Sequence, residues 1–266
     1  MNFFLPFAWR KQLACAVPEL CAIAHPWRDE SLFDSSPDHK ALSTDDLLLL
    51  SSRMGPMRPE RIPLFPLNVV LLPGGCLPLH IFEHRYRRMV RDCVGRSTEF
   101  GMLLSLTKGI VKVGCSAEVT EVCKTYPDGR MDILTTGRSP FRIVELLNAE
   151  EYRNDSLLEG QVDYLEDVEG EPTAQLRKNL IHLFEVCHTI VFGDYPRNLE
   201  SGPGHLSYIV AGTLPMELLW KQQVLELRSE ADRQERLVTY LREWAPHLQK
   251  AEATRRRSTG NGHGLN

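Results

Sequence analysis

Residues 62–90 read IPLFPLNVVLLPGGCLPLHIFEHRYRRMV, and this stretch decides the fold of the chain. Short apolar runs alternate with prolines, pass a Gly74-Gly75 pair and lead into a charged segment. Proline fixes φ and removes a backbone donor, so each apolar run is expected to be a short strand bounded by turns. The run VVLLP (residues 69–73) is accordingly predicted to be a strand that Pro73 closes before a tight turn.

A helix is expected over residues 82–94, directly after these strands. Apolar residues recur there with helical spacing, and the predicted core stripe consists of Phe82, Tyr86, Met89, Val90, Cys93 and Val94. The other side carries His84, Arg87, Arg88 and Arg91. This basic side is either a solvated face or a docking surface for an acidic peptide or RNA phosphate, because clustered cations can steer a partner. We take these four residues as the candidate partner-binding site.

The chain between residues 62 and about 165 is predicted to be mainly β. Strands are expected at FGMLLSL (100–106), VGCSAEVTEV (113–122), MDILTTG (131–137) and PFRIVEL (140–146). A turn is expected at residues 127–129, because Gly129 takes a positive φ without steric cost. Residues 154–171 hold seven acidic residues and no basic one, and Val162 and Tyr164 predict a strand that leads into an acidic loop.

From residue 172 onward the apolar spacing becomes helical. Pro172 is expected in the first turn of a helix whose stripe runs from Leu176 to Val191. A short helix at HLSYIVAG (205–212) and a longer one that opens at Thr213 follow. The last helix is expected to start at Ser229 and to end at Pro246. Strands followed by helices indicate an α+β class.

Composition excludes several classes of protein. The chain has 266 residues, 42% hydrophobic and 25% charged, with a net charge of −4, so there is no global attraction to nucleic acid or to an anionic membrane. No apolar run approaches the roughly 20 residues that span a bilayer. The seven cysteines are scattered and odd in number, which indicates a reducing compartment and inert thiols. We expect a cytoplasmic protein without a membrane partner.

The two ends are expected to lie outside the folded part. Residues 1–60 start apolar, but their first basic residue is Arg10, which is atypical of a secretory signal. They are interpreted as a poorly ordered extension, an amphipathic appendage, or the product of a start codon upstream of Met57. Residues 248–266 are polar, basic and Gly-rich, and are expected to be a disordered tail.

No catalytic constellation is evident in the sequence. The phosphate-binding pattern G-x-x-x-x-G-K-[ST] and the nucleophile elbow G-x-S-x-G do not occur. A zinc site at Cys15, Cys21 and His25 lacks a fourth ligand. Cys115 and Cys123 are expected to be two buried thiols. Cys76 with His80 or His84 is an alternative nucleophilic dyad, but a small apolar filler is the preferred interpretation of Cys76. We expect no catalytic residue, cofactor or metal.

The opening stretch resembles the signature of the Lon protease N-terminal (substrate-binding) domain family. The resemblance extends from about residue 62 to 245, through PLFPL (63–67), LPLHIFEHRYRRMV (77–90), DGRMDILTTGRSPFRI (128–143) and LPMELLWKQQVLEL (214–227). It implies a PUA-like, partly open β-barrel of about six strands with one helix at residues 61–168. A C-terminal helical bundle at residues 169–247 would complete the same domain.

The resemblance also sets the functional expectation. A complete Lon protease adds an ATPase module and a serine–lysine protease domain, and a Walker A motif is absent here, so a stand-alone, non-enzymatic protein- or peptide-binding module is expected. It would recognise unfolded or degradation-destined proteins, as an adaptor for a protease or as a chaperone-like factor. The alternative is an RNA-binding PUA-like protein, which the acidic net charge disfavours. Glu83, Arg85 and Tyr86 either tie the helix to the barrel or contact a partner, and Arg138 leaves the same two alternatives.

Overall fold

The computed structural model describes residues 58–152, 156–168, 170–196 and 205–260. The chain divides into two compact units, residues 1–59 and 60–266, and all described elements belong to the second. The predicted extension, apart from residues 58–60, and the candidate zinc ligands therefore lie outside the described residues. In chain order the elements are β1 (Arg61–Leu67), β2 (Cys76–Ile81), α3 (His84–Arg96), β3 (Phe100–Leu106), β4 (Gly109–Thr125), β5 (Met131–Leu146), α4 (Ala149–Tyr152), β6 (Leu158–Tyr164), α5 (Ala174–Phe192), α6 (Leu206–Thr213), α7 (Leu218–Glu226) and α8 (Glu230–Gly260).

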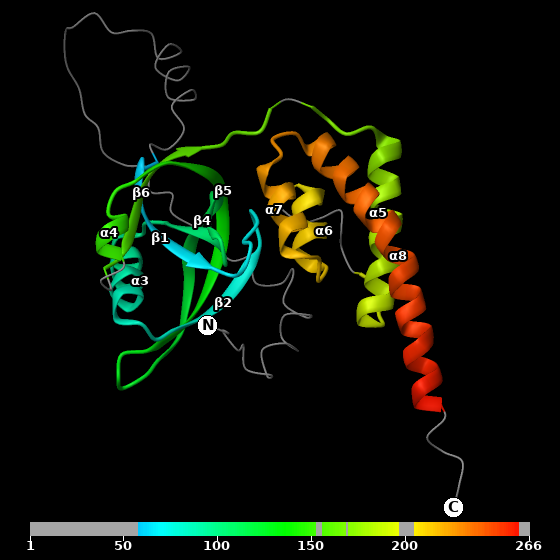
Figure 1. The fold of residues 1–266 in the computed structure, drawn as a ribbon, viewed down its shortest axis with the longest axis horizontal. Coiled ribbons are helices and arrows are strands. Elements are labelled where there is room, and N and C mark those ends of the chain that lie inside the picture. The colour runs from blue at the N-terminus through cyan, green and yellow to red at the C-terminus, as the bar shows by residue number, and fades with distance from the viewer. Residues whose placement is uncertain (1–57, 153–155, 169, 197–204, 261–266) are drawn as a thin grey trace, which may run out of the picture. The chain divides into compact units, whose positions relative to one another are not determined.

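The strands form one mixed sheet in the order β2-β5-β4-β3-β1-β6 (Figure 1). β1 and β3 run parallel, and the other neighbouring strands are antiparallel. β6 also pairs with β5, so the sheet returns on itself while β2 stays on the outer side of β5. The α+β class is therefore confirmed, but the six strands make a mixed sheet rather than a clean six-stranded barrel.

Residues 69–73 are not the strand that their apolar sequence predicts. Val70, Leu71 and Leu72 are buried, so the expectation of a core segment holds. Their backbone instead runs into a turn in which the Gly75 N–H donates to the Leu72 carbonyl at 2.9 Å. A Cβ on Gly137 would lie 2.2 Å from the same carbonyl oxygen. Close approach of this turn to β5, rather than strand pairing, determines the local structure.

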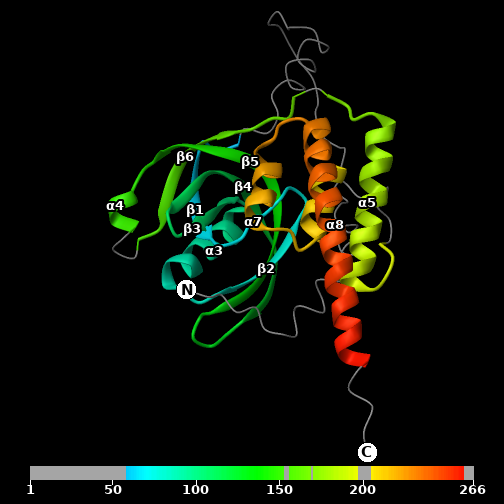
Figure 2. The same ribbon diagram turned by 45° about the vertical axis from the view of Figure 1, so that its right-hand side comes forward.

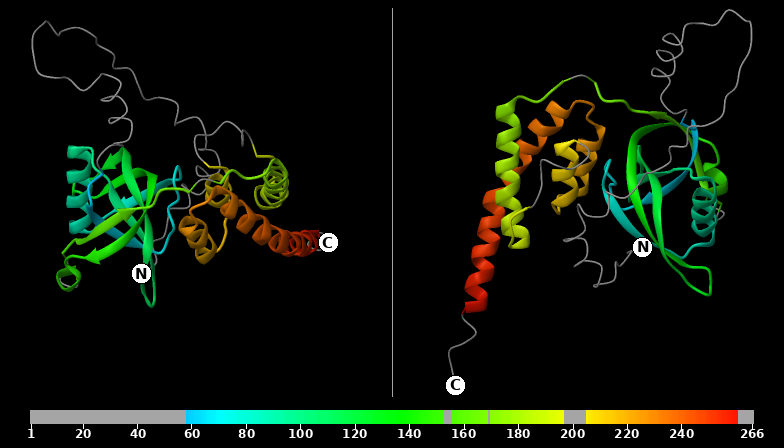
Figure 3. Two further views of the ribbon diagram at one scale, coloured as in Figure 1. Left: turned by 90° about the horizontal axis from the view of Figure 1, so that it is seen from above. Right: turned by 180° about the vertical axis from the view of Figure 1, so that it is seen from behind.

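β5 is one strand over residues 131–146, where two separate strands were expected. Pro140, which was expected to open the second strand, lies inside β5 opposite Cys115, next to a register shift between β4 and β5. The irregularity accommodates a residue without a backbone donor. β4 and β5 thus form a long hairpin, which extends past the neighbouring strands (Figure 3). The predicted turn is confirmed: Gly129 has φ 83° and its N–H donates to the Tyr126 carbonyl at 2.9 Å.

The helix α3 follows its predicted pattern in the middle and departs from it at both ends. Tyr86, Met89, Val90 and Cys93 are buried, and Phe65 of β1 lies 4.0 Å from Tyr86 between ring centroids. Phe82 precedes the helix, because Glu83 has extended backbone as the N-cap residue. Phe82 and Val94 are 44% and 46% exposed, so their assignment to the core stripe is wrong.

Two of the C-terminal helices, α5 and α7, start later than the sequence predicts. α5 begins after Thr173, whose Oγ1 accepts a hydrogen bond from the Leu176 N–H at 3.2 Å, so Pro172 lies before the helix. Thr213 is the last residue of α6 and does not open α7. Leu214 is extended, as is usual for a residue before proline, and Pro215 therefore separates the two helices.

The last helix starts where expected and ends beyond the predicted residue. The Ser229 hydroxyl accepts a hydrogen bond from the Asp232 N–H at 3.3 Å, in the manner of an N-cap. Pro246 lies inside α8, which continues to Gly260, so the predicted stop at Pro246 is wrong. Pro246 is exposed, so water can satisfy the carbonyl that it leaves unpaired. Figures 1 and 2 show α5 and α8 side by side, and the two helices are in contact.

One apolar core joins the sheet, α3 and the C-terminal helices, and a smaller cluster centred on Leu64, Leu103 and Phe141 fills the sheet. Gln222 of α7 adds a polar link, because its Nε2 donates to the Val113 carbonyl of β4 at 3.0 Å. Among the described residues, none of the helices is both long and apolar enough to cross a membrane.

Candidate functional site

The structure brings two of the four predicted site residues to the tip of the β4–β5 hairpin. Arg87 Nη1 donates to the Asp128 carbonyl at 2.5 Å. A Cβ on Gly129 would lie 2.9 Å from Arg87 Nη1 and 3.1 Å from Arg91 Nη2, so both guanidinium groups lie against this glycine. Arg88 instead points to Asp92 on its own helix, at 3.9 Å. His84 is the exposed first residue of α3.

Further cations surround an aromatic ring on the same hairpin. Lys124 Nζ lies 4.5 Å and Arg130 Cζ 5.1 Å from the centroid of the Tyr126 ring. Asp128 accepts hydrogen bonds from the Arg130 N–H at 3.1 Å and from Arg130 Nε at 2.6 Å. The backbone hydrogen bond from Arg130, followed by the Arg130 side chain, lowers the pKa of Asp128.

A hydrogen-bonded group of side chains follows on β2 and β5. Asp132 is held between His80 Nδ1 at 2.5 Å and the Tyr126 hydroxyl, which donates at 2.8 Å. Partial burial would raise the pKa of Asp132, but the hydrogen bonds from His80 and Tyr126 outweigh it and lower this pKa. The hydrogen bond to Asp132 raises the pKa of Tyr126. The exposed Phe82 ring lies next to His80, with centroids 6.3 Å apart.

We call this group of residues the tip surface. Its members are Phe82, His80, Arg87, Arg91, Lys124, Tyr126 and Arg130, with Asp128 and Asp132 between them. Four cations thus face two carboxylates, and hydrogen bonds lower the pKa of both below the ordinary value of 3.8. Both are therefore ionised at neutral pH. The surface has a net positive charge next to the exposed Phe82 ring and the half-buried Tyr126 ring.

The polar network expected at Glu83, Arg85 and Tyr86 is confirmed, with two extra members. Arg85 Nε donates to Glu83 at 3.0 Å, and Arg85 Nη1 reaches the Tyr152 and Ser156 carbonyls at 3.4 Å each. The Tyr86 and Tyr152 hydroxyls are 3.3 Å apart, and the Arg85 guanidinium stacks on both rings. This network ties α3 to α4 and to the segment before β6. Arg138 pairs with Glu118 of the neighbouring strand, with Nε donating at 2.7 Å.

The alternative nucleophilic dyad of Cys76 with His80 is not assembled. Cys76 Sγ lies 3.8 Å from Thr136 Oγ1, whereas His80 is bonded to Asp132. Cys76 and His80 both lie on β2, four positions apart, which in a strand corresponds to about 13 Å. Burial raises the pKa of Cys187 to about 11 and that of Cys115 further, as expected of inert thiols. Cys123 is exposed, so its prediction as a buried thiol is wrong.

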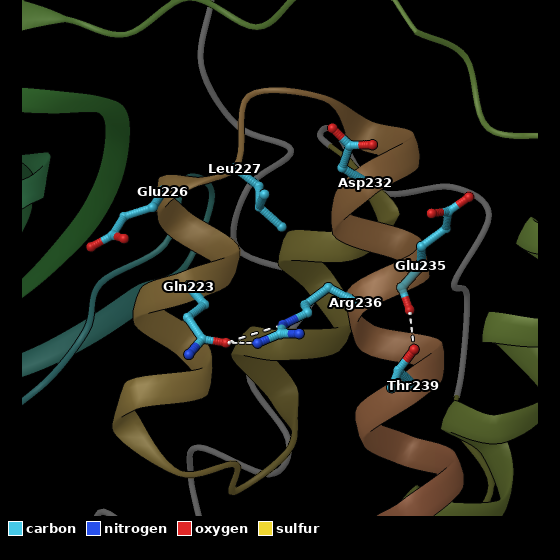
Figure 4. A pocket seen from close by; sticks show the side chains of 7 residues that line it. All are labelled: Gln223, Glu226, Leu227, Asp232, Glu235, Arg236 and Thr239. Atoms are coloured by element: carbon cyan, nitrogen blue, oxygen red, sulfur yellow. Dashed lines mark hydrogen bonds between the residues drawn. The ribbon is translucent and has the colours of Figure 1, made fainter.

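A hollow of about 470 Å³ opens between α7 and α8 (Figure 4). Arg236 faces Gln223 across it, with Nε donating to Oε1 at 3.1 Å, and stacks on Trp220. The carboxylates of Glu226, Asp232 and Glu235 point in different directions rather than toward one another, as Figure 4 shows. Over the described ranges, no group of three or more His, Cys, Asp or Glu side chains is placed to hold a metal ion.

A buried arginine that the sequence did not reveal joins the sheet to the helices. Arg233 of α8 is fully buried, and its Nη1 donates to Asp167 at 3.0 Å. Its Nε donates to Ser207 at 3.0 Å and to Glu230 at 3.2 Å, and its guanidinium lies 4.4 Å above the Tyr208 ring. Burial lowers the pKa of Arg233, but the contacts with Asp167, Tyr208 and Glu230 more than reverse this effect. We call these five residues the Arg233 cluster.

Comparison with known proteins identifies the family of this chain. The family model for the ATP-dependent protease La (LON) substrate-binding domain matches residues 61–243. The chain belongs to this family. The matched range starts at β1 and ends inside α8, so it includes both the tip surface and the Arg233 cluster.

Two curated relatives support the assignment to this family. The Lon protease of Dictyoglomus thermophilum is 23% identical over 199 residues, which are 69% of this chain and 24% of that protein. The Lon protease of Parabacteroides distasonis is 25% identical over 200 residues, which are 68% of this chain and 24% of that protein. The chain thus spans about a quarter of the length of these curated relatives.

Solved structures of Lon N-terminal domains have the same fold. The crystal structure of the Lon N-terminal domain protein from Xanthomonas campestris is 25% identical, with a TM-score of 0.53, and the match covers 68% of this chain and 98% of that one. The N-terminal domain of the Mycobacterium avium complex Lon protease is 16% identical, with a TM-score of 0.50 and coverage of 68% and 97%. At 16% identity the second match supports the fold alone.

Proposed function

We propose that this protein is a non-enzymatic binding module for unfolded or degradation-destined polypeptides, acting as an adaptor or a chaperone-like factor. The observation that carries the proposal is the match of a Lon substrate-binding domain model to residues 61–243. A family that binds protein substrates for Lon makes a polypeptide the natural ligand here. The buried, high-pKa thiols at Cys115 and Cys187 support a binding role over nucleophilic chemistry.

The proposed contact surface is the outward side of α3, at His84, Arg87, Arg88 and Arg91. These residues lie opposite the buried face of the helix, and three of them are exposed, so the core does not need them. Arg87 also supports the hairpin turn through Asp128, which places the basic side of α3 next to β4 and β5.

The finer structural and cellular assignments belong to the same proposal. We place a PUA-like β subdomain at residues 61–168 and a helical subdomain at residues 169–247. The basic segment from residue 248, expected to be disordered, is helical as far as Gly260, the end of α8. The free cysteines Cys76, Cys93, Cys115, Cys123 and Cys187 support a reducing, cytoplasmic environment.

The test is a binding isotherm with the full chain. Fluorescence anisotropy of a labelled, reduced and carboxymethylated protein, which is permanently unfolded, is compared with that of its folded parent. The proposal predicts saturable binding of the unfolded form and a much weaker response from the folded form. Equal responses from the two forms, or no saturation with the unfolded form, would contradict it.

A further inference from the structure

The tip surface combines features that the basic side of α3 alone does not have. Arg87 and Arg91 reach over Gly129 from the helix, while Lys124 and Arg130 flank the Tyr126 ring from the hairpin. Arg87 and Arg91 lie against Gly129, whose N–H donates to the Tyr126 carbonyl. From Tyr126 the contacts continue through Asp132 to His80 and Phe82. The result is a continuous strip over α3, β4, β5 and β2.

The charges on this strip are uneven. Arg130 bonds to Asp128, and the Asp132 carboxylate is occupied by His80 and Tyr126. Lys124 and Arg91 have no carboxylate within salt-bridge distance among the described residues. They therefore remain available to an incoming anion, and a cation over an aromatic ring keeps its charge exposed on the outer side.

The strip also offers apolar area. Phe82, directly after the edge strand β2, is 44% exposed, and Val122 of β4 is 40% exposed. The exposed Phe82 ring and the half-buried Tyr126 ring beside cations suit a ligand that carries both carboxylates and apolar groups, because each group then meets its complement.

We propose that the tip surface binds acidic polypeptide segments that carry aromatic or other apolar side chains. The proposal rests on the proposed polypeptide-binding function and gives that function a substrate class. Carboxylates of the segment would pair with Lys124 and Arg91, and its apolar groups would pack on Tyr126 and Phe82.

Two observations favour a polypeptide over RNA as the anion. Asp128 and Asp132 lie between the cations, where they would repel a dense run of phosphates but leave room for spaced carboxylates. The chain as a whole carries a net charge of −4, which provides no long-range attraction for a polyanion.

The experiment uses the full chain and three short unstructured peptides of identical apolar content, whose variable positions are all Glu, all Gln or all Lys. The variant Arg91→Glu/Lys124→Glu is compared with Arg242→Glu/Lys250→Glu, which makes the same charge change at exposed positions on α8. Thermal unfolding of both variants verifies that they fold. We expect the Glu peptide to bind about tenfold tighter than the Gln peptide at low salt, and only the tip variant to lose this preference.

The outcomes separate this proposal from the more general one. Equal binding of all three peptides would overturn the acidic preference and leave polypeptide binding intact. No binding of any peptide, with the unfolded protein still bound, would overturn the tip surface as a site for short segments. Tighter binding of a single-stranded RNA than of the Glu peptide, lost in the tip variant, would overturn the choice of polypeptide. If the α8 control lost the preference for the Glu peptide to the same extent, the net charge of the chain would explain the preference, and the proposal would also be overturned.

Discussion

The tip surface and the Arg233 cluster are both built from arginines, carboxylates and a tyrosine, yet one is exposed and the other is buried. Arg233 is fully buried, and its guanidinium is surrounded by Asp167, Ser207 and Glu230 and by the Tyr208 ring. At the tip, the side chains of Arg130 and Asp128 are 44% and 54% exposed, and cations outnumber carboxylates. The first arrangement satisfies its charges internally, while the second leaves charge available.

This difference has a physical basis. A guanidinium removed from water must recover its hydration through several charged hydrogen bonds, so a fully bonded buried arginine has little capacity left for a ligand. Asp167 follows β6, Tyr208 lies on α6, and Arg233 lies on α8, so the cluster connects the sheet to the helices. Exposed ion pairs stabilise a fold only weakly, and their residues can be used for binding.

Replacement of Arg233 is expected to have the largest effect on stability. In Arg233→Met, Asp167 and Glu230 lose their buried partner, so the free energy of unfolding should fall by about 3–5 kcal/mol. Urea denaturation measures the change, and Arg242→Met on the exposed side of α8 is the control. A loss as small as that of the control would mean that Arg233 does not hold the sheet and helices together.

Removal of the Tyr86 hydroxyl should have an intermediate effect. Tyr86→Phe keeps the buried ring against Phe65 but loses the contact with the Tyr152 hydroxyl, at a cost of about 1 kcal/mol. Tyr126→Phe, which removes a hydroxyl at the exposed tip, is the matched comparison by thermal unfolding. The order of the two effects would be reversed if the tip, rather than the α3–α4 network, were the rigid part.

Asp132 of the tip surface should make the stability depend on pH. The pKa of Asp132 is lowered in the folded state, so its contribution is present above its ordinary value of 3.8 and is lost as pH falls through the folded value. The stability difference between the wild-type chain and Asp132→Asn should therefore shrink as the pH is lowered from 5 toward 3 (about the range of aspartate titration). A difference that stays constant over this range in urea denaturation would rule out the charge of Asp132 as its source.

Charge reversal at Arg91 should have the smallest effect on stability. Arg91→Glu alters an exposed side chain, so the free energy of unfolding should change by no more than about 0.5 kcal/mol. Its effect on binding should be a several-fold loss of affinity for the acidic peptide. Arg233→Met should instead lower the stability strongly and leave the affinity for the acidic peptide unchanged, when binding is measured under conditions in which the variant is folded. If Arg91→Glu lowered the stability but left the affinity for the acidic peptide unchanged, the contrast between the tip surface and the Arg233 cluster would be wrong.

The parts of the fold that depend on local signals were predictable from the sequence. The α3 stripe at Tyr86, Met89 and Val90, the turn at Gly129 and the N-terminal signal at Ser229 act within a few residues of one another. The turn at residues 69–75 was missed because its conformation depends on Gly137, which is more than sixty positions away. The continuity of β5 through Pro140 likewise depends on an irregularity in its pairing with β4.

The candidate site shows the same limit. Arg87 and Arg91 could be selected from helical spacing, but Arg88 belongs with them only in sequence and pairs with Asp92 instead. His80, Asp132 and Lys124 become neighbours only through strand register, which places Asp132 opposite both others. The role of Arg233 could not be predicted from the sequence, because Asp167, Ser207 and Tyr208 lie outside α8 and, within the cluster, Glu230 alone shares its helix.

Hydrogen–deuterium exchange of the full chain, with and without a saturating permanently unfolded protein, tests the central claim most directly. If the tip binds and the Arg233 cluster only stabilises, protection should increase in residues 84–91 and 124–130 and stay unchanged in residues 205–236. Protection that appears in residues 205–236 while the tip exchanges as before would contradict the account.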